Sequence, residues 1–400
     1  MKDFEPTRER RSGRERRLLS LRRRTPAPDA VHEPDRRIVA DRRSGDERRA
    51  LAEDREQLSL GRRLRQPRTI LSLAIPLVLL YLIFRVFLNI DVNELIDGVG
   101  RSNKLVILAA FVIFYAGFPL RGLRWALLLR GTGIRLRTRD ATEIVFLSWL
   151  VNCLVPAKLG DIYRAYLLKI NSTVSLSRTV GTVFIERILD LFAIAALGLA
   201  AGFWSFRNGL PTEIQWVAAI GVAVMLLLAL GLLTLRNFGR RIIVRLPLPH
   251  RALELYDRFE EGVFGAIGLR ALPRLIVITG LIWATESLRL YLVVQALAFP
   301  GVSLGLSGAV FVALIGSLLT AVPLAPAGLG VVELGVVGVL VAAYHVSLAQ
   351  ATTIALVDRV ISVLSIIVLG SIAYWISPKR RGAGLSSDPG EAAAGAADPA

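Results

Sequence analysis

The sequence predicts an all-α integral membrane protein with about 8 transmembrane segments and two re-entrant or broken-helix elements that form an inverted repeat. Hydrophobic residues make up 54% of the 400 residues, and charged residues only 20%. Apolar runs of about 20 residues recur through residues 70–376, and each is long enough to cross a hydrocarbon core about 30 Å thick as a helix. Since a backbone in lipid must satisfy its own hydrogen bonds, helices are the expected structure.

Three domains are expected along the chain. Residues 1–68 are rich in Arg and contain two similar octets, RRSGRERR at Arg10–Arg17 and RRSGDERR at Arg42–Arg49. Such a segment has too few apolar residues to bury a core, so a disordered cytoplasmic tail is expected. It either attaches to an anionic lipid surface, with about 1 kcal/mol per basic residue, or remains a solvated tail that keeps the N-terminus inside. Residues 69–376 form the membrane domain, and residues 377–400 form a second disordered cytoplasmic tail.

Composition argues against several kinds of partner and cofactor. The formal net charge is +17, but the excess lies in the tail and between apolar runs, as the positive-inside rule requires, so no nucleic-acid partner is predicted. The single cysteine, Cys153, allows no intramolecular disulfide, and the three histidines lie far apart. The sequence therefore predicts no metal site and no cofactor. It contains no phosphate-binding GxxxxGKS or GxxxxGKT loop, so ATP could act only through a partner protein.

Loop charge predicts how the chain crosses the cytoplasmic membrane. The Arg-rich segments 121–140 and 236–272 are expected to be cytoplasmic loops, and the SPKRR sequence after the last apolar run places the C-terminus inside as well. Segments 141–178 and 303–349 would then each begin and end on one face, as re-entrant or paired broken helices do. The apolar runs lie at 70–88, 104–120, 141–157, 179–204, 215–235, 273–299, 303–322 and 350–376, with a broken stretch at 324–346.

The two broken segments belong to an internal repeat. Val145–Leu168 is similar to Val310–Leu340, since each has an apolar run followed by proline, glycine and an acid. The flanking sequences also pair in the same order: LRWALLL with LRLYLVV, and ERILDL with DRVISV. Because loop charge makes the halves enter from opposite faces, the repeat is predicted to be inverted, an arrangement whose substrate sites form near the midplane between the repeats. Chance similarity between generic membrane helices is the alternative.

Ionisable residues inside the apolar runs are the strongest functional signal. A charge at the centre of a bilayer costs roughly 2.5–3.5 kcal/mol, so these side chains should face the protein interior or water. Asp161 with Arg164, Glu286 with Arg289, and Arg187 with Asp190 are spaced three residues apart and share a helix face. They either hold helices together as ion pairs, or present arginines that bind a phosphate while the acids position them. Free N–H groups at helix starts after the two breaks would also favour an anion.

Three motifs resemble the flippase-like membrane domain of lysylphosphatidylglycerol synthases. They are Asn152-x-x-x-Pro156-x-x-x-Gly160-Asp161-x-x-Arg164, Glu186-Arg187-x-x-Asp190, and Pro323-x-x-Pro326-x-Gly328-x-Gly330-x-x-Glu333. Ala327 departs from the resemblance, because relatives usually have glycine there. The resemblance covers residues 70–376 and implies a stand-alone member that translocates a lipid-linked headgroup. About 24 residues follow the last predicted span, so aminoacyl transfer is not expected.

The leading hypothesis is translocation of a lipid or lipid-linked anionic headgroup, supplied by a partner enzyme that makes the lipid. An accessory or scaffold subunit of a lipid or glycan assembly pathway is the main alternative, and a membrane lipid transferase is a further one, although no nucleophile motif favours an enzyme. No catalytic residue or metal ligand is assigned. The candidate substrate-binding residues are Arg124, Asn152, Pro156, Gly160, Asp161, Arg164, Glu186, Arg187, Asp190, Glu286, Arg289, Gly328, Gly330, Glu333, Asp358 and Arg359.

Overall fold

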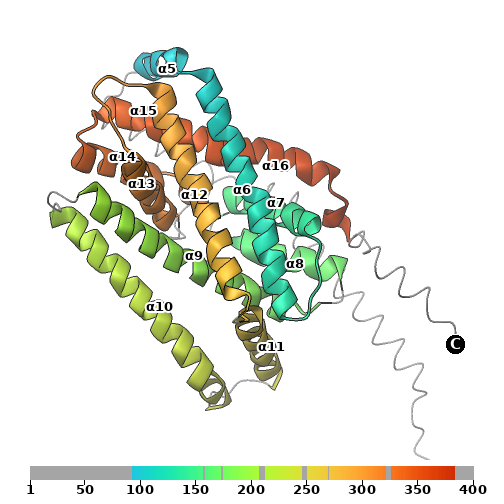
Figure 1. Ribbon diagram of the computed structural model, residues 1–400. Helices are drawn as coiled ribbons and strands as arrows, with labels where there is room; N and C mark the ends of the chain where they lie inside the picture. The colour runs from blue at the N-terminus through green and yellow to red at the C-terminus, as the bar shows by residue number, and fades with distance from the viewer. Residues whose placement is uncertain are drawn as a thin grey trace, which may run out of the picture. The chain divides into compact units, whose positions relative to one another are not determined.

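The structure is a computed structural model in which every regular element is a helix within the residues it describes: 92–155, 158–172, 174–206, 212–245, 250–268, 270–320 and 326–382 (Figure 1). The Arg-rich tail, the predicted span at 70–88, Pro156 and Pro323 lie outside these residues. The helices are α5 Val92–Arg101, α6 Lys104–Gly131, α7 Thr138–Leu154, α8 Leu159–Asn171, α9 Leu176–Ser205, α10 Thr212–Arg245, α11 His250–Ala266, α12 Leu272–Leu297, α13 Leu306–Leu319, α14 Val331–Tyr344, α15 Leu348–Arg359 and α16 Ser365–Ile376.

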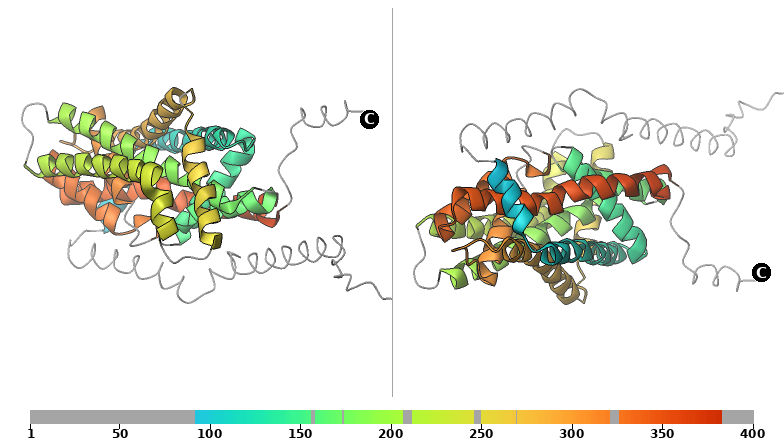
Figure 2. Two further views of the ribbon diagram at one scale, coloured as in Figure 1. Left: turned by 90° about the horizontal axis from the view of Figure 1, so that it is seen from below. Right: turned by 90° about the horizontal axis from the view of Figure 1, so that it is seen from above.

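Several helices have the length and composition of membrane spans. Among the described residues, α6, α12 and the continuous helix Leu348–Ile376 are long and apolar enough to cross a membrane. The last of these consists of α15 and α16 joined through a π-helical turn at Val360–Leu364, and the two run on as one long helix in Figure 2. The all-helical membrane class is therefore confirmed, whereas the number of spans stays a prediction.

Residues 121–140 were predicted to form a loop, and this was wrong for the first half of the segment, which is helical. Helix α6 continues to Gly131, and Pro119 lies within it. Two arginines of this segment, Arg121 and Arg124, lie away from water: they are only 4% and 1% exposed and bond to carboxylates on neighbouring helices. The predicted connection 236–272 is likewise largely helical, in α10 and α11.

The two broken elements are helix pairs. Helices α7 and α8 pack against each other, as do α13 and α14. At 13 residues for α8 and 14 each for α13 and α14, these three helices are roughly 20 Å long, shorter than a hydrocarbon core of about 30 Å. Both breaks contain a left-handed non-glycine residue, Lys158 (φ 53°) before α8 and Ala327 (φ 52°) before α14. The breaks are confirmed, and re-entry from one face stays a prediction.

Contacts between α6 and α12 have the pattern of an internal two-fold axis. Arg121 and Glu286 occupy the same repeat position, three residues before Arg124 and Arg289, and they form an ion pair with each other. Phe114 lies ten residues before Arg124, and Thr279 lies ten residues before Arg289, so these two also occupy equivalent positions. Arg124 donates to Thr279 Oγ1 (3.1 Å), and the Arg289 guanidinium lies 5.1 Å from the Phe114 ring centre.

Such crossed contacts arise when two antiparallel helices are exchanged by a two-fold rotation. Helices α6 and α12 run side by side in opposite directions (Figure 1). The halves also exchange helices: α9 of the first packs on α13 of the second, where Gly202 faces Phe311, and α16 packs on α7, where Gly370 faces Leu150. The repeat found in the sequence is thus an inverted structural repeat, with residues from both halves meeting at the centre.

The short turn Pro378–Arg381, which follows α16, forms an ion pair with α7 and a hydrogen bond with α8. The Lys379 ammonium lies 2.8 Å from Asp140 Oδ1, and Asn171 donates to the Lys379 carbonyl at 2.7 Å. Ser377 donates to Glu143 at the start of α7. The basic residues after the last span therefore bond to the first repeat.

Candidate functional site

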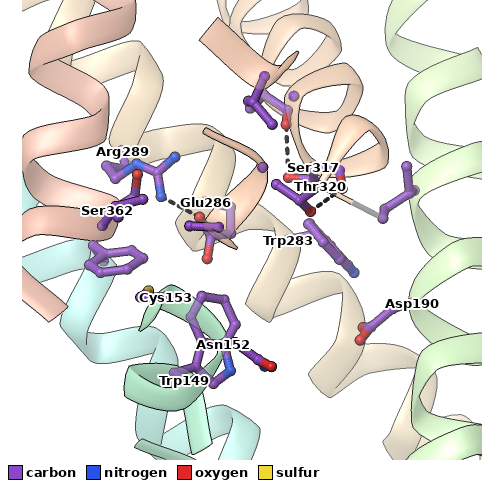
Figure 3. A pocket seen from close by; sticks show the side chains of 18 of the residues that line it. Trp149, Asn152, Cys153, Asp190, Trp283, Glu286, Arg289, Ser317, Thr320 and Ser362 are labelled. Atoms are coloured by element: carbon purple, nitrogen blue, oxygen red, sulfur yellow. Dashed lines mark hydrogen bonds and ion pairs between the residues drawn. The ribbon is translucent and has the colours of Figure 1, made fainter. Parts of the chain in front are cut away.

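A cavity of about 380 Å³ lies between the two repeats. Its walls come from α6 to α9 in the first half and α12 to α15 in the second, and Figure 3 shows side chains from both halves around it. Most of the sequence-predicted site residues line it: Arg124, Asn152, Asp161, Glu186, Arg187, Asp190, Glu286, Arg289, Gly328, Glu333, Asp358 and Arg359. Gly160, Arg164 and Gly330 lie outside the lining but hydrogen-bond to residues in it, while Pro156 is outside the described residues.

Arg124 is the centre of a buried network in the first half. Its guanidinium donates to both oxygens of Asp190, at 2.5 and 3.0 Å, and to Glu186 at 3.0 Å. The two acids are four residues apart, so they share one face of α9. Arg164 donates to the other Glu186 oxygen at 3.0 Å, whereas Asp161, its predicted neighbour, is 4.0 Å away. The main partner of Arg164 is thus on another helix, because α8 and α9 face each other here.

A second ion pair fixes the break between α7 and α8. Arg187 donates through two nitrogens to the Asp161 carboxylate, at 2.6 and 2.7 Å, in the bidentate geometry that favours arginine. Asn152 donates to Asp161 at 3.3 Å and accepts from the Gly160 backbone at 2.9 Å.

Gly160, a candidate from the sequence motif, serves close packing in the structure. It lies within α8, with no left-handed φ, and a Cβ there would lie 2.0 Å from the Ser148 carbonyl oxygen. The absence of a side chain is what allows α8 to approach α7.

The second half repeats the same charge pattern. Arg289 donates to both oxygens of Asp358, at 2.8 and 3.0 Å, as Arg124 does to acids on α9. Arg359 Nε lies 3.0 Å from Glu333 Oε1. This ion pair is the counterpart of the pair between Arg187 and Asp161 in the first half. Glu333 also accepts from the Gly330 backbone at 2.7 Å and so caps α14. Both halves therefore use one arginine on the long central helix and one beside the break.

Arg121 is a cavity residue that the sequence interpretation missed, since it was counted as a loop charge. Its guanidinium lies 4.6 Å from the Trp149 ring centre, in cation–π contact, and it shares Glu286 with Arg289. Lys158 and Trp283 also line the cavity and were not predicted. The signal for Lys158 was a lone basic residue at a helix break, which pairwise acid–base spacing does not detect.

Among the described residues, most of the hydrogen-bonding capacity left unused in the cavity belongs to donors. A buried carboxylate oxygen without a hydrogen bond, Glu333 Oε1, lies 3.0 Å from Arg359 Nε in an ion pair. Each oxygen of the six lining carboxylates accepts a hydrogen bond or pairs with an arginine: Asp161, Glu186, Asp190, Glu286, Glu333 and Asp358. By contrast, Arg121 Nη1, Arg359 Nη2 and Trp283 Nε1 are buried and have no hydrogen-bond partner among the described residues. Unpaired buried donors are costly, so the arrangement suits a guest that brings acceptor oxygens.

Comparison with known proteins identifies the family. Residues 69–370 match the family model for the lysylphosphatidylglycerol synthase TM region. A UPF0104 membrane protein of Methanocaldococcus jannaschii is 38% identical over 228 residues, covering 56% of this chain and 93% of that protein. A UPF0104 membrane protein of Methanothermobacter thermautotrophicus is 28% identical over 299 residues, covering 70% and 86%.

The glycosyltransferase AglD of Haloferax volcanii is 26% identical over 332 residues, which cover 72% of this chain and 51% of AglD. The family model covers most of the chain, including every described residue that lines the cavity. The chain therefore belongs to the lysylphosphatidylglycerol synthase TM region family of integral membrane proteins.

Proposed function

We propose that this protein translocates a lipid with an anionic, phosphate-containing headgroup across the cytoplasmic membrane. The headgroup occupies the cavity between the repeats while the hydrocarbon chains stay in the bilayer. The observation that carries this proposal is an excess of unused donors. Each lining carboxylate is paired with an arginine, whereas Arg121 Nη1, Arg359 Nη2 and Trp283 Nε1 have no hydrogen-bond partner among the described residues. A phosphate supplies the acceptor oxygens that such donors require.

The size and position of the cavity support the proposal. A volume of about 380 Å³ is in the range that holds small ligands, roughly 300–1,000 Å³, and suits a headgroup better than a whole lipid. The cavity lies between inverted repeats beside two broken helices, which is where secondary transporters bind their substrates. The ion pairs at the two breaks, Arg187 with Asp161 and Arg359 with Glu333, are placed to exchange partners as the halves move.

The proposal includes a role without bond-making chemistry. A general base needs a carboxylate oxygen free to take a proton. Five of the six lining carboxylates accept hydrogen bonds from arginines, and the sixth, Glu333, is ion-paired with Arg359. The second candidate function is an accessory subunit of a glycan-lipid pathway, favoured by the similarity to AglD, whose name describes a glycosyltransferase. In either function a partner enzyme supplies the lipid, the termini are cytoplasmic, and the Arg-rich N-terminal tail binds an anionic lipid surface.

Purified protein in vesicles tests translocation. An anionic phospholipid is placed in both leaflets, and an impermeant headgroup reagent reports how fast the inner pool becomes accessible. We expect the wild-type protein to accelerate exchange and Arg187→Gln to slow it at least 10-fold, because Asp161 loses its bidentate partner.

The matched control is Arg178→Gln on the same helix. Arg178 pairs with the exposed Glu261 at 2.6 Å, outside the cavity, where an ion pair contributes little. Its exchange rate should equal that of the wild type. Equal rates for Arg187→Gln and the wild type would remove the cavity from the mechanism.

A further inference from the structure

Lys158 occupies an unusual place in the cavity wall. It is the residue before α8, at the break in the first repeat, and it lines the cavity. Its backbone is left-handed, with φ 53° and ψ 35°, a conformation that is unfavourable for a residue with a side chain. Unfavourable backbone conformations of this kind tend to persist where function requires them.

Among the described residues, Lys158 also differs from the other lining cations in forming no ion pair with a carboxylate. The lining arginines are each paired: Arg121 with Glu286, Arg124 with Asp190, Arg187 with Asp161, Arg289 with Asp358 and Arg359 with Glu333. No ion pair or hydrogen bond of the Lys158 ammonium occurs among the residues that the structure describes.

The cations of the site outnumber its carboxylates by one. Among the residues that the structure describes, six cations and six carboxylates line the cavity. Arg164, behind the lining, is a seventh cation and bonds to one of the same carboxylates, Glu186. The surplus of one corresponds to Lys158, the lining cation for which the described residues show no ion pair or hydrogen bond.

The second repeat has the same backbone twist without the charge. Ala327 stands at the corresponding break with φ 52° and also lines the cavity. The left-handed turn is thus a property of both repeats, whereas the ammonium is present in only one. Binding of an anion at the breaks is expected to be asymmetric for this reason.

We propose that Lys158 directly binds the phosphate of the headgroup, and that the preferred ligand is a phosphodiester lipid carrying a single negative charge at this phosphate. This inference rests on the proposed function. The compact ammonium on a flexible stem contacts a phosphate as a point charge. Arg121 Nη1, which is buried in the same cavity lining and has no hydrogen-bond partner among the described residues, provides a second donor. A phosphodiester group neutralises the surplus charge, and the carboxylates keep their arginine partners.

Binding to the full-length protein in detergent tests this proposal. The probes are phosphatidylglycerol and a polyprenyl phosphodiester sugar, the two sources of the same chemistry, with diacylglycerol as a neutral lipid. We expect Lys158→Gln and Lys158→Gly to weaken binding of the preferred phosphodiester by about 10–100-fold, and Lys158→Arg to remain within a few-fold of wild type. Lys169→Gln is the control, because Lys169 lies in the last turn of the same helix and outside the cavity.

The variants separate charge from backbone conformation. Loss of binding in both Lys158→Gln and Lys158→Gly, with retention in Lys158→Arg, supports contact with the phosphate, and the lipid that binds identifies the source. Tight binding by Lys158→Gln overturns the assignment of Lys158 but leaves the proposed function intact, provided the wild type binds. If only Lys158→Gly loses binding, the backbone matters rather than the charge, and the assignment is also overturned. Failure of the wild type to bind either phosphodiester overturns both proposals.

Discussion

Arg124 illustrates how a single residue joins three parts of the protein. It extends from α6 to two acids on α9 and to Thr279 on α12, and it is 1% exposed. Burying a charge is unfavourable unless its partners also lie there, so arginine and both acids are mutually dependent. Arg187 is different, because 30% of its side chain is exposed at the cavity and its pairing can change more easily.

The two arginines should therefore differ in their effect on stability. Arg124→Ala leaves Asp190 and Glu186 buried with fewer partners and is expected to lower the free energy of unfolding by about 3–5 kcal/mol. Arg187→Gln should lower it by much less. Thermal unfolding of both variants in the same detergent measures the difference, and equal melting temperatures would show that Arg124 is not a structural centre.

The break between α7 and α8 depends on one close approach. The Gly160 backbone donates to Asn152, and Asn152 donates to Asp161, so the position of the acid that holds Arg187 depends on this contact. Any side chain at residue 160 would collide with the backbone of α7. Stability and the geometry of the cavity wall are thus coupled in this element.

Gly160→Ala is expected to destabilise the protein by roughly 1–3 kcal/mol, because its Cβ would lie 2.0 Å from the Ser148 oxygen and overpacking forces the helices apart. Gly280→Ala is the control, since that position in α12 has no atom within 4 Å of a Cβ and alanine favours the helix. Melting temperatures should fall for the first variant and hold or rise for the second. The opposite order would contradict the close-packing role.

The elements were predictable where a long apolar run coincided with a helix, as in α9 and α12. The continuation of α6 beyond residue 121 was not predictable. A sequence does not reveal that Arg121 and Arg124 form ion pairs with acids on other helices. Spacing also identifies only partners within one helix, and so missed the pairing of Arg164 with Glu186. Proline and glycine located both breaks, whereas the unpaired Lys158 needed the three-dimensional set of charges.

At the scale of the whole molecule, the inverted repeat explains why one cavity contains two similar charge networks. The axis passes near the contact of Arg121 with Glu286, where equivalent positions of α6 and α12 meet. Because each half contributes long helices that pack on the other, movement of one half relative to the other would change both breaks together. This arrangement is suited to exposing a central site to one side at a time.

Lipid sidedness in cells that lack the protein tests the central claim most directly. An impermeant headgroup label reads the outer leaflet, and mass spectrometry measures total lipid. We predict that one phosphate-containing lipid keeps its mass and abundance but loses its outer-leaflet pool, and that the wild type restores it whereas Arg187→Gln does not. If the mass or total amount of the lipid changes while its sidedness does not, the protein modifies the lipid or assists an enzyme that does, and translocation is contradicted.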